Sequence, residues 1–266
     1  MMKRILLAAF AAVLVAATAQ AQTTKPKVTD LGGAPESIIW IGNSFFYFNN
    51  GMGGHVGRLN ASAEAAKALR STEATISGSS LQWHDVESYF RPNAVGAFSF
   101  DPENNVVFNK NEKLFDAAVM MDCSQCPIHP TLKSQFTEYA KKDSDIVRKH
   151  GGKPVLFMSW AYQNKPEMTE GLAEAYTVAG NDNNVLVIPA GLAFARVIKE
   201  HPEITLYIAD KRHPTLAGTY LGAATSYAAL FKHSPVGLAY TAGLDPAVAK
   251  TLQEAAWATV QAYYAK

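Results

Sequence analysis

Five short apolar runs, separated by segments with helical patterns, constrain the fold of this chain most strongly. The runs contain β-branched or aromatic residues, as buried strands do, and they cover 37–41, 74–77, 117–121, 155–159 and 185–188. The helical patterns lie between and after them, at 56–70, 131–152, 168–180, 215–232 and 246–264. Alternating strands and helices predict a parallel sheet covered by helices on both faces.

The length of the chain fits one large domain. It has 266 residues, of which 48% are hydrophobic, and this is ample for a single core. No repeat and no linker interrupts the pattern, so we expect one domain over 37–266. The preceding segment 22–36 is polar and contains proline and glycine, which is typical of a flexible leader.

The first 21 residues have the three parts of a secretory signal peptide. Lys3 and Arg4 form a basic region, 5–17 form an apolar region, and Ala19-Gln20-Ala21 is a small-x-small cleavage site. The apolar region is too short for a membrane span, which needs about 20 residues. We therefore expect a periplasmic or secreted protein, with no membrane attachment after cleavage.

Charge and motifs exclude several function classes. Without Lys3 and Arg4, 22 basic residues face 23 acidic ones, so no nucleic-acid partner is expected. The histidines other than His213 show no metal-ligand spacing. Neither a dinucleotide fingerprint nor a Walker loop is present in the sequence. We expect no cofactor and no metal, while the oligomeric state stays open.

Cys123 and Cys126 are the only cysteines, and they have the spacing C-x-x-C. In an oxidising exported compartment this spacing favours a local disulfide. A thioredoxin-like role fits less well, because that motif opens a helix early in a βαβ unit. Here it follows a mid-chain strand and runs into prolines.

Ser44 stands at the carboxyl end of the first predicted strand, where open parallel sheets bind their ligands. A serine needs an adjacent base and a group that orients the base before it acts as a nucleophile. Asp210 and His213 lie three residues apart in a predicted loop, with Pro214 at the start of a helix. The alternative for Ser44 is a helix cap, and that for Asp210 is a cap as well.

Together these residues resemble the blocks of the SGNH or GDSL-type hydrolases. Gly42-Asn43-Ser44 resembles the first block, and Asp210-Lys211-Arg212-His213 resembles the last one. The resemblance covers about residues 38–237 and implies a three-layer α/β/α sandwich with a parallel, flavodoxin-like five-stranded sheet. It also implies ester hydrolysis through an acyl-serine, with Ser44 as nucleophile, His213 as base and Asp210 as the orienting carboxylate.

The resemblance also implies an oxyanion hole. The backbone N–H groups of Ser44 and Gly78 would be two donors, although Gly78 is also typical of an ordinary strand-ending turn. The usual third block, Gly-x-Asn-Asp, is missing after strand three, and the side chains of Gln125 and Ser124 are the alternatives. The Gly-Asn-Asp inside 179–184 reads instead as a turn at the amino end of a strand.

The resemblance and the predicted export favour a carbohydrate ester, such as an acetylated sugar, as substrate. Residues that would line its site are Asn43, Trp83, His84, Trp160 and Tyr162, although buried aromatics are the commoner reading. The long connection 83–113 would be a lid or wall, or else a separate apolar cluster. Rival functions are a catalytically inactive carbohydrate-binding protein and an O-acyltransferase.

Overall fold

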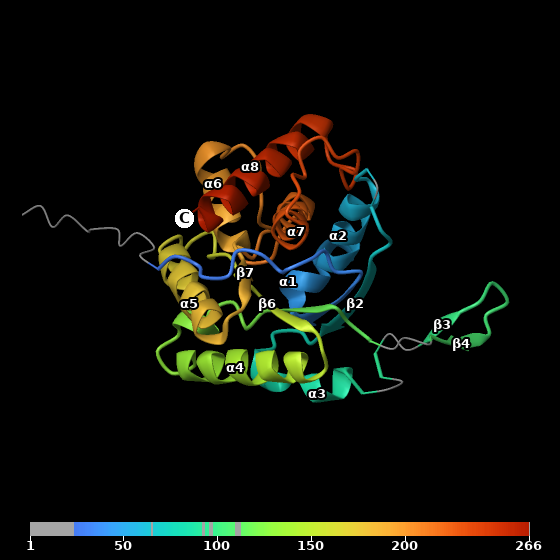
Figure 1. The fold of residues 1–266 in the computed structure, drawn as a ribbon. Helices are drawn as coiled ribbons and strands as arrows, with labels where there is room; N and C mark the ends of the chain where they lie inside the picture. Colours follow the sequence, from blue (N-terminus) through green and yellow to red (C-terminus); the bar gives the residue numbers. More distant parts are fainter. Residues whose placement is uncertain (1–23, 65, 92–93, 96–97, 110–112, 266) are drawn as a thin grey trace, which may run out of the picture.

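A computed structural model of the chain describes residues 24–64, 66–91, 94–95, 98–109 and 113–265 (Figure 1). The predicted signal peptide, 1–21, lies outside the described residues. Among the residues described, no helix has the length and apolar character that a membrane span requires.

A five-stranded parallel sheet forms the centre of the structure. Its strands are β1 (Ser37–Gly42), β2 (Arg70–Thr75), β5 (Ala117–Met120), β6 (Lys153–Phe157) and β7 (Leu186–Ile188). They lie in the order β2-β1-β5-β6-β7, and all neighbours are parallel. Counting only the strands of this sheet, the order is 2-1-3-4-5, so the predicted flavodoxin-like arrangement is confirmed.

Helices cover both faces of the sheet (Figure 1). One layer contains α2 (Met52–Ala61), α6 (Ala190–Glu200), α7 (Leu216–Phe231) and α8 (Pro246–Tyr264). The other contains α3 (Val86–Tyr89), α4 (Lys133–Lys149) and α5 (Met168–Asn183). Short helical turns complete the chain: α1 (Ser44–Tyr47), η1 (Phe48–Asn50), η2 (Leu81–Trp83) and η3 (Cys126–Ile128). The predicted three-layer α/β/α sandwich is therefore present.

The pattern of burial explains why the central elements were predictable. Every residue of β1 is buried, and so is every residue of β5, because helices cover both faces. Helix α7 is buried from Ala217 to Leu230, since it lies between α2, α6 and α8. An element buried all round reads as a continuous apolar run, and this is the signal that the sequence offers.

Three boundaries differ from the expectation. The helix expected over 56–70 ends at Ala61, and β2 begins already at Arg70, earlier than the expected 74–77. β2 is an edge strand with only half-buried residues, so it lacks an apolar run. The helix expected over 168–180 continues through 181–183, which were expected to lie in a turn, and Asn184 ends it in a left-handed conformation.

Residues 24–36 contact the domain, whereas a flexible leader would not. Thr24 bonds to the Glu174 carboxylate through its backbone N–H and its hydroxyl. The side chain of Asn181 both accepts from and donates to this segment, and the Lys153 ammonium donates to its backbone carbonyls. Side chains from the distant elements α5 and β6 thus satisfy backbone groups of this segment, and its local composition cannot show such contacts.

The connection 83–113 divides into two parts. Phe90 packs edge-on against Phe115 in the main core, with ring centroids 5.6 Å apart. The strands β3 (Phe98–Phe100) and β4 (Val106–Phe108) form a hairpin that projects away from the body in Figure 1. The aromatic side chains of this hairpin are more than half exposed. The hairpin is therefore neither a lid over the sheet edge nor part of the main core.

Asp143 on α4 gives the fold a testable pH dependence. Its side chain is buried, and its Oδ2 has no hydrogen-bond partner among the described residues. Burial raises its pKa from 3.8 to about 7, with Lys142 opposing and Asp122 adding to the rise. Between these two values the folded state binds more protons than the unfolded state, so stability falls as pH rises through this range.

We therefore expect Asp143→Asn to raise the melting temperature at about pH 8, and the gain to shrink towards about pH 4. Thermal unfolding followed by circular dichroism at both pH values measures it. Asp145→Asn is the control, because Asp145 is an exposed carboxylate on the same helix that pairs with Lys141. An equal rise in melting temperature for Asp143→Asn at both pH values would show that burial does not raise the pKa of the Asp143 carboxyl.

Candidate active site

Ser44 is the first residue of α1, directly after β1. The cap of this helix is Asn43, whose side chain accepts a hydrogen bond of 3.2 Å from the backbone N–H of Phe45. The hydroxyl of Ser44 instead lies 2.8 Å from Nε2 of His213. The alternative in which Ser44 caps the helix is therefore wrong, and its hydroxyl faces a candidate base.

Asp210 contacts the far side of the same imidazole. Its Oδ2 lies 2.5 Å from Nδ1 of His213, while its Oδ1 accepts from the backbone N–H groups of Arg212 and His213, both at 2.9 Å. Burial raises its pKa, but these hydrogen bonds outweigh the effect and bring it to about 2. The carboxylate thus stays ionised at neutral pH, and it can hold the ring with Nδ1 protonated.

The loop with His213 enters α7 later than expected. Pro214 pairs with Tyr207 in a short bridge, and α7 begins at Leu216 with Thr215 as its cap. Thr215 fills the capping role that was the alternative for Asp210. Ser44, Asp210 and His213, predicted to act together, are therefore brought together by the fold although 166 or more residues separate Ser44 from the other two.

Aromatic side chains that directly follow Ser44 fix the imidazole. Phe48 stacks on the His213 ring at 4.3 Å, and Phe45 meets it edge-on at 5.5 Å. Asn49 donates to the carbonyl of Pro214 at 3.0 Å, which attaches the loop to the same segment. These residues were not expected at the site, although the run of aromatic residues that follows Ser44 in the sequence was a signal for them.

Trp160 supports the site from within the core. It is fully buried between Phe45 and Phe194, with centroid distances of 4.5 and 4.2 Å in parallel stacks. Its indole N–H donates to the carbonyl of Arg212, next to His213. The expectation that Trp160 contacts a sugar is wrong for this structure, since a buried indole with a bonded N–H offers no stacking surface.

Gly78 lies in the turn that follows β2. The backbone N–H of Ser79 donates to the carbonyl of Ile76, and Gly78 has a φ of +71°, which favours glycine. A Cβ at this position would meet no atom within 4 Å. The strand-ending turn is present, and the open space beside it leaves the backbone N–H of Gly78 a candidate oxyanion donor.

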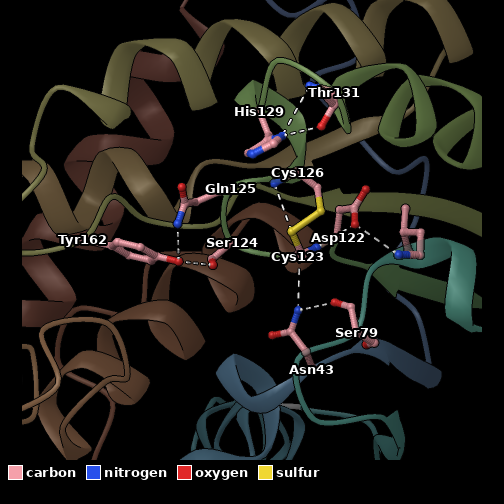
Figure 2. Close-up of a disulfide and its surroundings, with 11 residues drawn as sticks. Asn43, Ser79, Asp122, Cys123, Ser124, Gln125, Cys126, His129, Thr131 and Tyr162 are labelled. Carbon is pink, nitrogen blue, oxygen red and sulfur yellow. Dashed lines mark hydrogen bonds between the residues drawn. A yellow bond between two sulfur atoms is a disulfide. The ribbon is translucent and has the colours of Figure 1, made fainter.

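The two alternatives for the missing third donor both contact Tyr162 (Figure 2). The Gln125 amide donates to the Tyr162 hydroxyl at 3.0 Å, and the Ser124 hydroxyl lies 2.6 Å from the same oxygen. Arg212 covers the Tyr162 ring. Through these contacts, Tyr162 links the loops after β5 and β6 to the loop of His213. Because Tyr162 is buried, a role in stacking on a sugar does not fit.

The other residues expected to bind substrate divide by exposure. Asn43 is buried and its amide donates to the backbone carbonyls of Ser79 and Asp122. His84 is buried as well, between Ser79 and Tyr89, and burial lowers its pKa. Both differ from the expectation because their polar atoms are used inside the protein. Trp83 is 61% exposed and remains available.

Cys123 and Cys126 form a disulfide, as the sequence predicted (Figure 2). The bridge encloses the turn that follows β5 and precedes η3. The disulfide lies at the carboxyl edge of the sheet, beside Asn43 and Asp122 (Figure 2). A thioredoxin-like motif would instead open a long helix early in a βαβ unit.

Comparisons with known proteins find likeness in structure alone. No protein-family model matches the chain, and no curated protein matches it in sequence. A DUF4886 family protein from Bacteroides uniformis superposes with a TM-score of 0.61 and 17% identity, over 86% of this chain and 96% of that one. A protein from Slackia heliotrinireducens, described as a candidate SGNH hydrolase, superposes with a TM-score of 0.54 and 20% identity, over 73% of this chain and 98% of that one.

A third solved structure is Axe2, an acetylxylan esterase from Geobacillus stearothermophilus. It superposes with a TM-score of 0.52 and 16% identity, over 74% of this chain and 95% of that one. At such identities the comparison establishes the arrangement of the elements, and the chemistry has to be argued from the residues. The strand order, the helical layers and these neighbours together show that the chain has the fold of the SGNH hydrolases.

Proposed function

We propose that this protein is an exported SGNH-family serine ester hydrolase that acts through an acyl-serine intermediate. The observation that carries the proposal is the chain of contacts from the Ser44 hydroxyl through the His213 imidazole to the Asp210 carboxylate. A hydroxyl, a base that can take its proton and a carboxylate that orients the base are the parts that nucleophilic acyl transfer requires.

The proposed reaction uses these contacts in two half-reactions. Nε2 of His213 takes the Ser44 proton as the oxygen attacks the ester carbonyl, and the backbone N–H groups of Ser44 and Gly78 stabilise the oxyanion that forms. His213 then returns the proton to the departing alcohol, which leaves an acyl-serine. In the second half, His213 activates a water that releases the acid and restores the Ser44 hydroxyl.

The proposed substrate is an acetyl ester of a carbohydrate. One structural neighbour is named as an acetylxylan esterase, and the predicted export would place this chain where glycans are accessible. Trp83, with its exposed indole on the loop after β2, is the available surface for stacking on a sugar ring. The acyl group and the alcohol are the finer parts of the proposal, because fold alone does not fix them.

A fluorophosphonate probe tests the proposal directly. The wild-type protein should be labelled at Ser44, as read by peptide mass spectrometry, and should release acetate from acetylated xylo-oligosaccharides. Absence of both labelling and acetate release would instead favour a catalytically inactive binding protein. Transfer of the acetyl group to an added sugar, in preference to water, would identify an acyltransferase that uses the same acyl-serine.

A further inference from the structure

Asp122 lies directly after β5, at the place where the usual third block of the SGNH hydrolases is missing. Asp122 is 2% exposed, which is rare for a residue whose carboxylate has no cationic partner among the residues that the structure describes. We propose that Asp122 is a positioning residue that holds the loop after β2 in register with the loops after β1 and β5. This inference rests on the proposed ester hydrolysis at Ser44.

The carboxylate of Asp122 joins two of these loops. Its Oδ1 accepts from the backbone N–H of Leu81 at 3.1 Å and from its neighbour Cys123 at 2.6 Å. Leu81 lies three residues after Gly78, so the same oxygen that fixes the turn after β5 also fixes the segment with the candidate oxyanion donor. A backbone N–H that is buried without a partner destabilises the folded state, so these bonds define where the segment lies.

The backbone carbonyl of Asp122 makes the third connection. It accepts from the Asn43 amide at 3.2 Å, and that amide also donates to the carbonyl of Ser79 at 3.0 Å (Figure 2). The other end of the Asn43 side chain caps α1 at Phe45. An unbroken series of hydrogen bonds therefore runs from Asp122 to the helix start on which Ser44 lies.

The disulfide restricts the turn that holds Asp122. The carboxylate oxygen and the two sulfurs lie within 4.8 Å of one another, and the backbone N–H of Cys126 donates to the Cys123 sulfur. Because Cys123 is both bridged and bonded to Asp122, the carboxylate has little freedom to turn away from Leu81. Burial raises the pKa of Asp122 to about 6, opposed by the two N–H donors, so it is ionised in an assay at about pH 8.

Two substitutions separate the hydrogen bonds of Asp122 from its charge. Asp122→Ala removes the acceptor, and we expect kcat to fall about 100-fold with KM nearly unchanged, because a misplaced oxyanion donor affects the transition state more than the ground state. Asp122→Asn keeps an oxygen for both N–H groups, and we expect it to restore kcat to within about tenfold of the wild type.

Asp143→Asn is the matched control, because Asp143 is an equally buried carboxyl for which no hydrogen bond to these loops is found among the described residues. The two carboxylates repel each other, but Asp122 is ionised at about pH 8 with or without the charge of Asp143, so the kcat of Asp143→Asn should equal that of the wild type. Amide hydrogen exchange gives a readout that needs no turnover: the N–H of Leu81 should exchange faster in Asp122→Ala than in Asp143→Asn. If Asp122→Ala does not fold, Asp122→Ser takes its place, since a serine side chain is too short to reach Leu81.

Each result decides the inference. A folded Asp122→Ala protein with wild-type kcat, or unchanged exchange at Leu81, would overturn it, and so would an Asp122→Asn variant as slow as Asp122→Ala. If the wild type itself hydrolyses no ester and escapes the fluorophosphonate, the proposed function fails. In that case, the exchange at Leu81 still decides whether Asp122 positions the loop.

Discussion

Ser44→Ala and His213→Ala should each lower ester turnover by several orders of magnitude, and the double variant should be hardly slower than either single one. In the proposed mechanism the two residues, whose side chains lie 2.8 Å apart, act in one proton transfer, so removing either partner would remove the nucleophile. Initial rates on an aryl acetate and on an acetylated xylo-oligosaccharide measure the effect. The rate that remains would report what the oxyanion donors and binding contribute alone.

Thermal stability separates this loss from a folding defect. Asn43, and not Ser44, caps α1, so Ser44→Ala should leave the melting temperature nearly unchanged. Ser226→Ala is the control, because Ser226 is a buried, hydrogen-bonded serine on α7 that should affect stability without affecting turnover. Wild-type turnover in Ser44→Ala would refute the proposed nucleophile, whatever the melting temperature.

The parts of the fold that the sequence predicted are those that local pattern determines. Strands buried on both faces must be apolar throughout, so β1, β5, β6 and β7 were recognisable, and their alternation with helices implied the parallel sheet. The meeting of Ser44 with the Asp210–His213 loop was predictable for a related reason. Ser44 follows β1 at the carboxyl edge of the sheet, where ligand sites form, and the spacing Asp210-x-x-His213 matches a short motif of a known hydrolase family.

The parts that the sequence did not predict depend on distant partners. β2 is half exposed at the edge of the sheet, so the polar residues 70–73 gave no strand signal and the strand was expected only over 74–77. Helix α6 begins two residues after β7 ends, and no helix was expected between the strand at 185–188 and the helix at 215–232. Residues 24–36 have the composition of a flexible leader, yet side chains from α5 and β6 form hydrogen bonds with their backbone.

Side-chain roles in the site were harder to predict than its location. Asn43, Trp160 and Tyr162 are residue types that bind sugars, but each is buried and hydrogen-bonded to another loop. Their effect is to hold the three catalytic candidates in place, and this depends on the register between loops. A motif describes the residues that react, whereas the supporting contacts differ with each packing of the same fold.

Asp210→Asn should lower kcat by roughly 10³–10⁴-fold, although asparagine has the same shape as aspartate. This loss should be smaller than that of Ser44→Ala. Oδ1 of Asp210 accepts from two backbone N–H groups, and Oδ2 faces Nδ1 of His213. An asparagine keeps its oxygen on the two backbone donors, so its NH₂ group points at the imidazole. Nδ1 must then accept a hydrogen bond, which places the proton on Nε2, where the ring can no longer take one from Ser44.

Asp245→Asn is the control for this substitution. Asp245 accepts from the backbone N–H groups of Ala247 and Val248 in the same way, but it caps α8 and no bond to a histidine is found for it among the described residues. Asparagine caps helices as well as aspartate does, so turnover should be unchanged. Steady-state kinetics would show the contrast, and ¹⁵N NMR of the imidazole would show the proton on Nε2 in Asp210→Asn. An Asp210→Asn enzyme with wild-type kcat would mean that Asp210 only shapes the loop, because a carboxylate that orients the base cannot be replaced by a donor.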